Sequence, residues 1–307
     1  MTPVVRDRFG RPVDSLRISV TLRCNHSCVF CHMEGIIKDG KLRELSPEDF
    51  GFIAEVLRRY GVRNYKLTGG EPLVRGDIVE IVSQLRPYAY DLSMVTNGSL
   101  LKHFAKPLAE AGLDRMNVSL HSLREDVFRR ITGGKLKPVL EGIEEALQYG
   151  HIIKLDYVYL SWNKGELKDV VNYAASKGLD LNVIELIPIG MSEDLYSALE
   201  AGMNPVLRFL ESVAVSKKVN PFQNRPTYTL PEGIRVTVIL GYGNPYLCAA
   251  CTRLRMTPDG KFKTCIFDND NLVDAWDAIK GRDGEGLTSK FLEAVNRREP
   301  HFKFEGE

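Results

Sequence analysis

The chain has 307 residues, with 41 Lys and Arg against 40 Asp and Glu and a formal net charge of +1. Because the basic and acidic residues are nearly equal in number, the charge does not indicate a nucleic-acid-binding or membrane-binding protein. We find no run of about 18 apolar residues for a membrane span and no N-terminal apolar run of signal-peptide length. We therefore expect a cytoplasmic protein, in which cysteine thiols stay reduced.

Short apolar segments alternate along the chain with amphipathic helical patterns. The predicted strands are 16–21, 65–68, 92–96, 116–120, 154–160 and 182–186, and the predicted helices are 46–60, 77–86, 100–112, 138–149 and 165–177. Repeated strand–helix alternation favours a parallel sheet with right-handed crossovers. We expect an α/β fold, a partial (β/α)6 TIM-like barrel. An open doubly wound sheet would give a similar order of elements.

Beyond residue 190 the alternation weakens. A helical pattern over 195–216 leads to a proline-rich connector over 217–233. Two further strand patterns, 236–240 and 261–267, follow, with a turn at 258–260 before the second. We place a domain boundary near residue 220, with a partial barrel over 1–220 and a small α+β domain over 221–307.

On several predicted strands the residues of one parity, that is every second residue, are polar. Arg17, Lys66, Ser119 and Lys154 alternate with apolar neighbours. Helices should cover the apolar outer face of a barrel, so the polar parity should face the lumen. A lumen lined with cations and hydroxyls is costly unless it holds a polar, anionic ligand. The alternative is the solvated face of an open sheet.

The six cysteines fall into two triplets, one with the spacing C-x3-C-x2-C and one with C-x2-C-x13-C. They are Cys24, Cys28 and Cys31, and Cys248, Cys251 and Cys265. A closed zinc site needs four ligands, and thiolates select zinc, copper(I) or iron–sulfur clusters. Three cysteines on a 4Fe–4S cubane would leave the fourth iron open to a ligand. A zinc or transient redox loop is the alternative.

A Gly69-Gly70-Glu71-Pro72 turn follows the second predicted strand. Paired glycines let the backbone approach a ligand closely, and a carboxylate beside them can bind an ammonium group. A plain strand-to-helix turn would have the same sequence.

Taken together, the loop CNHSCVFC and the GGEP turn one βα unit later resemble the radical S-adenosylmethionine (SAM) superfamily. The second triplet stands in C-x2-C-T-R-L-R-M-T-x-D-G-x4-C, which is similar to the C-terminal motif of the GTP 3′,8-cyclase family. The agreement extends over about residues 5–301. The resemblance implies a radical SAM barrel with a C-terminal cluster-binding domain, and a lyase acting in the first step of molybdenum cofactor biosynthesis.

The resemblance also implies two 4Fe–4S clusters and SAM as cofactors. The first triplet would hold the cluster that cleaves SAM, and the second a cluster that binds the purine of GTP. SAM would contact Phe30, Gly70, Glu71 and Ser119, and GTP would contact Arg17, Lys66, Val95, Lys154, Arg253, Leu254 and Arg255. Arg253 and Arg255, with the first triplet, are also the expected catalytic residues. Their guanidiniums suit phosphate binding.

GTP and an electron donor are the expected partners, without membrane or nucleic acid, and a homodimer is considered. Many family members end in two glycines, where this chain has Gly306 followed by Glu307. One alternative is another radical SAM enzyme that uses an auxiliary 4Fe–4S cluster to modify a peptide or a different nucleotide. A second is a non-catalytic iron–sulfur or zinc protein. The Arg-Leu-Arg motif counts against the first alternative, and the polar lumen and GGEP count against the second.

Overall fold

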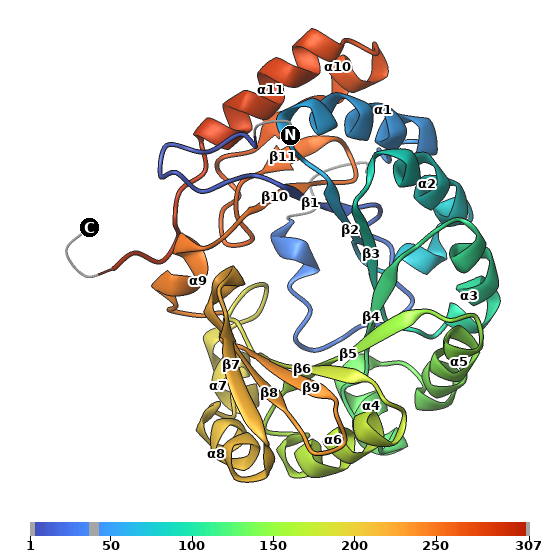
Figure 1. Cartoon of the computed structure of the whole chain (residues 1–307), viewed down its shortest axis with the longest axis vertical. Coiled ribbons are helices and arrows are strands. Elements are labelled where there is room, and N and C mark those ends of the chain that lie inside the picture. The colour runs from blue at the N-terminus through green and yellow to red at the C-terminus, as the bar shows by residue number, and fades with distance from the viewer. Residues whose placement is uncertain (1–3, 37–42, 305–307) are drawn as a thin grey trace.

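A curved sheet with helices on its convex face forms the body of the protein (Figure 1). The computed structural model describes residues 4–36 and 43–304, so the predicted C-terminal feature at Gly306 and Glu307 lies outside the described residues. Its first six strands are β1 (Ser15–Ser19), β2 (Asn64–Thr68), β3 (Asp91–Thr96), β4 (Arg115–Ser119), β5 (Ile152–Tyr159) and β6 (Asp180–Glu185). The six predicted strands are thus confirmed to within two residues.

Helices connect these strands along the outside of the curve. They are α1 (Pro47–Leu57), α2 (Ile78–Leu85), α3 (Leu101–Glu110), α4 (Glu125–Thr132), α5 (Leu136–Gln148) and α6 (Leu167–Ser176). The apolar parity of the strands packs against them, with Leu16, Leu67 and Val118 fully buried. The helices lie on one side of a strongly curved sheet, which confirms the partial barrel and excludes the doubly wound alternative.

The C-terminal third extends both edges of this sheet. It contributes β7 (Ser216–Asn220), β8 (Arg225–Thr229), β9 (Arg235–Ile239), β10 (Arg253–Met256), β11 (Lys261–Lys263) and β12 (Val273–Asp274). The strand order is β12-β11-β10-β1-β2-β3-β4-β5-β6-β9-β8-β7. Because β10 is parallel to β1 and β9 is parallel to β6, the parallel part holds two more strands than the six predicted. The predicted boundary at residue 220 falls at the end of β7 and stays a prediction.

The remaining helices are α7 (Glu193–Leu199), α8 (Asn204–Val213), α9 (Pro245–Ala249), α10 (Trp276–Lys280) and α11 (Gly284–Asn296). Short 3-10 turns are η1 (Met33–Gly35), η2 (Arg58–Tyr60), η3 (Pro72–Val74), η4 (Arg86–Tyr88), η5 (Lys164–Glu166) and η6 (Phe222–Asn224). Within the described ranges no helix is both long and apolar enough to cross a membrane.

Three sequence-based assignments were wrong. The predicted helix over 195–216 is two helices, because Gly202 has a φ of 63° and Pro205 lies in the first turn of the second, which begins at Asn204. The predicted connector over 217–233 forms the antiparallel pair β7–β8. The helix α4 was missed, although Glu125 and Asp126 in its first turn and Gly133 at its C-cap are ordinary helix signals.

Asp49 joins the barrel to the C-terminal helices. Its buried carboxylate accepts hydrogen bonds from the Ser46 N–H, Lys280 Nζ and Arg282 Nη1, each at 2.9 Å. Burial by itself would raise the pKa of Asp49, but the hydrogen bonds from Lys280 and Ser46 and the two cations outweigh it and lower the pKa. Asp49 therefore contributes to stability as a carboxylate.

We expect Asp49→Ala to lower the free energy of unfolding by about 2 kcal/mol, the range for hydrogen bonds to a charged group. Because the folded-state pKa is depressed, this contribution is present above the unfolded pKa of about 3.9 and is lost as the pH falls through the folded value. Urea denaturation at pH 7 and pH 3 measures it. Glu48→Ala, one residue earlier on the exposed side of the same turn, is the control. Equal midpoints for the two variants at pH 7 would contradict the assignment.

Candidate active site

One cavity inside the curve of the sheet is lined by both cysteine triplets. The first triplet lies on the loop that follows β1, and the second on the segment that runs from β9 across to β10 and on past β11. These loops are more than 200 residues apart in the sequence. The parallel pairing of β10 with β1 places them over the same cavity.

The loop of the first triplet is held from outside by the end of α4. The Ser27 and Val29 N–H groups donate to the Thr132 and Ile131 carbonyls at 2.9 Å each. The His26 N–H donates to Cys24 Sγ at 3.4 Å. Burial raises the pKa of Cys28 to about 12, and Cys31 and Cys24 beside it add to the effect. Without metal this thiol stays protonated, so cluster assembly must release its proton.

The GGEP turn lies directly against the chain that enters this loop. The Gly70 N–H donates to the Thr21 carbonyl and the Glu71 N–H to the Arg23 carbonyl, both at 2.8 Å. A Cβ on Gly70 would stand 2.2 Å from the Arg23 oxygen. The glycine is thus required by the close approach of the two backbones.

Glu71 is buried beneath this turn. Its carboxylate accepts hydrogen bonds from the Leu73 N–H (3.0 Å), Thr96 Oγ1 (2.7 Å) and the Asn97 N–H (2.6 Å). Burial raises the pKa of Glu71 to about 7 against the effect of these donors. The carboxylate therefore fixes the start of the loop after β3 beside the first triplet.

A buried ion network supports the second triplet. Arg11 Nη1 donates to the Cys248 carbonyl at 3.0 Å, and Arg298 Nη2 donates to the Cys251 carbonyl at 2.7 Å. Asp7 lies between the two guanidiniums, 2.8 Å from Arg11 and 3.0 Å from Arg298. Two cations against one carboxylate leave this region positive beside the thiols. Burial would raise the pKa of Cys251, but Arg253, Arg298 and Arg11 lower it overall.

The donors around both triplets fit iron–sulfur clusters. Three thiols in each loop face one cavity, and the Phe302 N–H donates to Cys248 Sγ at 3.4 Å, as the His26 N–H does to Cys24. Such N–H···S bonds are among the contacts that tune cluster potentials. In residues 4–36 and 43–304 no three His, Cys, Asp or Glu side chains are placed to hold one metal ion. A cubane takes each thiolate on a different iron, and the three thiols that each loop places at the cavity fit such a cluster.

Three cations form a row across neighbouring strands of the cavity wall, here called the cation row. Arg255 on β10 is in register with Arg17 on β1, and Arg17 with Lys66 on β2. Neighbouring strands lie about 4.8 Å apart, so these cations repel one another unless an anion lies between them. The Arg17 Nε is buried and has no hydrogen-bond partner in the described part of the chain. The row is therefore suited to a polyanion.

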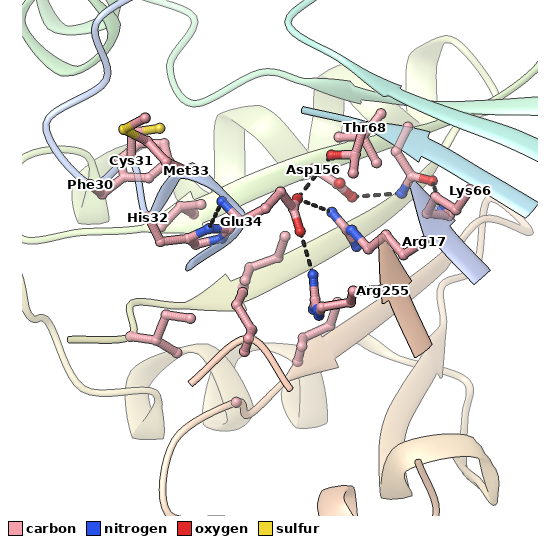
Figure 2. Close-up of a pocket in the computed structure, with 18 of the residues that line it drawn as sticks. Arg17, Phe30, Cys31, His32, Met33, Glu34, Lys66, Thr68, Asp156 and Arg255 are labelled. Carbon is pink, nitrogen blue, oxygen red and sulfur yellow. Dashed lines mark hydrogen bonds and ion pairs between the residues drawn. The ribbon is translucent and has the colours of Figure 1, made fainter. Parts of the chain in front are cut away.

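In this structure the anion is Glu34, from the turn η1 just after Cys31 (Figure 2). Its carboxylate lies 2.7 Å from Arg17 Nη2, accepts a hydrogen bond from Thr68 Oγ1 at 2.9 Å, and forms a second ion pair with Arg255. Burial would raise the pKa of Glu34, but Arg17 and Arg255 lower it strongly, so it is ionised.

The polar parity continues as a hydrogen-bonded chain on the far wall. Lys66 Nζ donates to Asn117 Oδ1 at 2.8 Å, and Asn117 and Asn182 both donate to Asp156 Oδ1, at 2.9 and 2.6 Å. Burial lowers the pKa of Lys66 well below its usual value, and Arg115 and Arg17 lower it further. A bound anion would raise that pKa again.

The structure brings most of the predicted site residues to the cavity. The residues that line it are Arg17, Cys24, Cys28, Phe30, Cys31, Lys66, Gly70, Glu71, Val95, Ser119, Cys248, Cys251, Arg253, Arg255 and Cys265. Phe30 packs edge-on against His121 with ring centroids 4.8 Å apart. Lys154 and Leu254 are not among the lining residues. Lys154 Nζ lies 4.0 Å from Asp180, and Leu254 is fully buried in the hydrophobic core.

Sequence reasoning missed several charged residues that also line the cavity, among them Glu34, Arg225, Arg11 and Arg298. Arg225 begins β8, inside the segment predicted to be a connector. The pattern Cys31-His32-Met33-Glu34 placed a carboxylate close to the first triplet, which was a usable signal for Glu34. Nothing in the sequence pattern paired Arg11 with Arg298, which are 287 residues apart.

Comparisons with known proteins decide the family. Residues 18–174 match the description "Radical SAM superfamily", and residues 179–304 match "Molybdenum Cofactor Synthesis C". A "Probable GTP 3′,8-cyclase" of Thermococcus kodakarensis is 48% identical over 305 residues, covering 97% of this chain and 99% of the relative. The protein of the same name from Saccharolobus solfataricus is 40% identical over 307 residues, with the same coverage. The chain belongs to the GTP 3′,8-cyclase family of the radical SAM superfamily.

Solved structures agree on the fold. Streptococcus suis SuiB bound to S-adenosylmethionine has a TM-score of 0.67 at 14% identity, covering 86% of this chain but only 64% of SuiB. Native anSMEcpe with bound AdoMet has a TM-score of 0.58 at 16% identity, covering 90% of this chain and 82% of that one. Membership of the superfamily implies a 4Fe–4S cluster and SAM as cofactors.

The approach of the GGEP turn to the first loop gives a prediction. Gly70→Ala should lower the free energy of unfolding by about 1–3 kcal/mol, the usual cost of overpacking, and weaken SAM binding, because the Arg23 carbonyl must move. Gly76→Ala is the control, since a Cβ there meets no atom within 4 Å. For each variant, denaturation measures the free energy of unfolding and equilibrium dialysis measures SAM binding. SAM binding by Gly70→Ala equal to that of Gly76→Ala would contradict the assignment.

Proposed function

We propose that this protein converts GTP to 3′,8-cyclo-7,8-dihydroguanosine 5′-triphosphate, with SAM and two 4Fe–4S clusters as cofactors. The observation that carries the proposal is one cavity lined by both cysteine triplets and by the cation row. The family relatives support the reaction, and the cavity supports the substrate class, because a row of three in-register cations is matched to a polyphosphate.

Each wall of the cavity has its own part in this proposal. Cys24, Cys28 and Cys31 would hold the cluster that binds SAM, beside Gly70 and Glu71 of the GGEP turn. When bound, this cluster and SAM supply one-electron cleavage of SAM and removal of the hydrogen from ribose C3′. Phe30, in the loop of the first triplet, packs against His121. Burial lowers the pKa of the His121 imidazole to about 3 and keeps it neutral.

The part of the cavity wall that carries the second triplet and the arginines of β1 and β10 would hold GTP. Cys248, Cys251 and Cys265 would hold a second cluster whose fourth iron has no cysteine ligand and is open to the purine. Arg17, Arg253 and Arg255 would neutralise the triphosphate. The two arginines of β10 share a parity and line the same cavity, so both can bind phosphate oxygens bidentately. Fixing both ends of the nucleotide holds the ribose in one orientation, which is the main contribution that a protein makes to cofactor chemistry.

Judged by the fold alone, a radical SAM enzyme that modifies a peptide is the alternative function. SuiB and anSMEcpe share the fold at 14–16% identity, which carries no argument about substrate. The full-length relatives and the cation row favour a nucleotide triphosphate.

Turnover with labelled substrate tests the function. Anaerobically reconstituted protein with SAM, a reductant as electron donor and GTP deuterated at C3′ should release 5′-deoxyadenosine carrying deuterium, and a product with the composition of GTP. The triple alanine variant of Cys24, Cys28 and Cys31 should release none. Unlabelled deoxyadenosine, or equal turnover of other nucleotides, would overturn the proposal.

A second prediction concerns the second cluster. Reconstituted protein should hold about eight irons per chain, taking four for each cubane. The triple alanine variant of Cys248, Cys251 and Cys265 should hold about four and still bind SAM. Iron analysis with parallel zinc analysis measures this. A stable content near four irons in the unmodified protein, with zinc as the remaining metal, would disprove the second cluster.

The arginines of β10 give a third prediction. Arg253→Ala and Arg255→Ala should each weaken GTP use by roughly ten- to a hundred-fold, since hydrogen bonds to charged groups contribute about 1.5–3 kcal/mol. Lysine at either position should restore only part of this loss, because it cannot bind bidentately. Arg208→Ala, at an exposed position on α8, is the control. Steady-state kinetics with GTP measure this loss. If both alanine variants keep the turnover rate and the KM of the parent protein, the substrate assignment is refuted.

A further inference from the structure

Glu34 occupies the cation row at the point where the proposed function needs phosphate. The carboxylate uses Arg17 Nη2 and an N–H of Arg255, and Thr68 Oγ1 donates to the same oxygen that Arg17 contacts. Figure 2 shows the carboxylate between the two guanidiniums. The Glu34 side chain is 6% exposed, and those of Arg17 and Arg255 are 18% and 13% exposed. The one carboxylate therefore offsets part of the charge of the two guanidiniums, largely shielded from bulk water.

The backbone that carries Glu34 lies between the two cysteine triplets. Glu34 is three residues after Cys31, and a Cβ on Gly35 would stand 2.0 Å from the carbonyl oxygen of Ile266, the residue after Cys265. The turn thus touches both cluster loops. The turn that carries Glu34 therefore lies against a neighbour of each triplet.

This turn has a backbone conformation that needs support. Met33 and Glu34 have φ values of 46° and 56°, in the left-handed region that side chains other than glycine rarely adopt. Such conformations persist where the surroundings hold them. The support here is the Glu34 carboxylate in the cation row and the hydrogen bond from the Glu34 N–H to His32 Nδ1 at 3.0 Å.

We propose that Glu34 is an internal anion that holds the cation row while no nucleotide is bound, and that the triphosphate displaces it and releases the turn 33–35. The inference rests on the proposed function. A phosphate oxygen on the same guanidinium N–H groups would lie within a few ångströms of the carboxylate, where two negative charges repel strongly in a partly dry cavity. Arrival of the polyanion is thereby coupled to the backbone beside the SAM-cleaving triplet.

Binding measurements on the reconstituted, anaerobic protein test the displacement. The probes are inorganic tripolyphosphate, which has no purine, and GTP. Glu34→Gln keeps the size of the side chain and removes its charge, so its Kd for both probes should fall about tenfold, which corresponds to about 1.4 kcal/mol. Glu185→Gln is the matched control, because Glu185 lines the same cavity but accepts hydrogen bonds from the Gly241 and Tyr242 N–H groups instead. Its Kd for tripolyphosphate should stay within about twofold of the parent value, less than about 0.4 kcal/mol.

Hydrogen exchange is measured on the unmodified protein, so this second test does not depend on the folding of a variant. Saturating tripolyphosphate should speed amide exchange in residues 33–36, where the Gly35 N–H donates to the His32 carbonyl and the Ile36 N–H to the Met33 carbonyl. Slower or unchanged exchange there would overturn the inference, as would an unchanged or higher Kd for Glu34→Gln.

The two hypotheses fail separately. Tighter tripolyphosphate binding by Glu34→Gln, with faster exchange at 33–36 but no labelled product from GTP, would sustain the displacement and overturn the proposed function. Normal conversion of GTP with neither effect would sustain the function and overturn the displacement.

Discussion

Three positive side chains in register on adjacent parallel strands are the constraint on which the site depends. Arg255, Arg17 and Lys66 point to one side of the sheet because they share a parity, and they lie on neighbouring strands that are about 4.8 Å apart. Their repulsion must be offset by an anion. Glu34 supplies it to Arg17 and Arg255 within the protein, and a triphosphate supplies it in the proposed reaction. The turn after the first triplet, the strand β10 and the substrate are therefore linked through one set of charges.

The C-terminal third completes this arrangement from both edges of the barrel. The strand β9 pairs with β6 and β10 pairs with β1, so the segment that joins them must pass from one edge of the open barrel to the other. Cys248 and Cys251 lie on that passage, and Arg11 and Arg298 fix their carbonyls from beneath. This is the physical reason that two triplets so distant in the sequence line one cavity.

The close contacts around the first triplet are made by backbone. Gly70 brings the GGEP turn to within hydrogen-bond distance of Thr21 and Arg23, while the end of α4 holds Ser27 and Val29 from the other side. Glu71 fixes the loop after β3 through three donors. The loop of the first triplet is thus held by three elements of the barrel.

The sequence by itself determined the six barrel strands, five of their helices and fifteen of the residues that line the cavity. Period-two polarity on the strands and the two cysteine spacings are local signals. The pairing of β10 with β1, the ion pairs of Glu34 and the Asp7–Arg11–Arg298 network were decided only by tertiary structure. Apart from the Asp7–Arg11 pair, these contacts join residues 17 to 291 positions apart in the chain, and no spacing rule reports them. The same holds for Lys154 and Leu254, whose parity or motif suggested the site but whose surroundings are Asp180 and the apolar core. A side chain's position along a strand fixes its face, but its place along the depth of the barrel follows only from the register of every neighbouring strand.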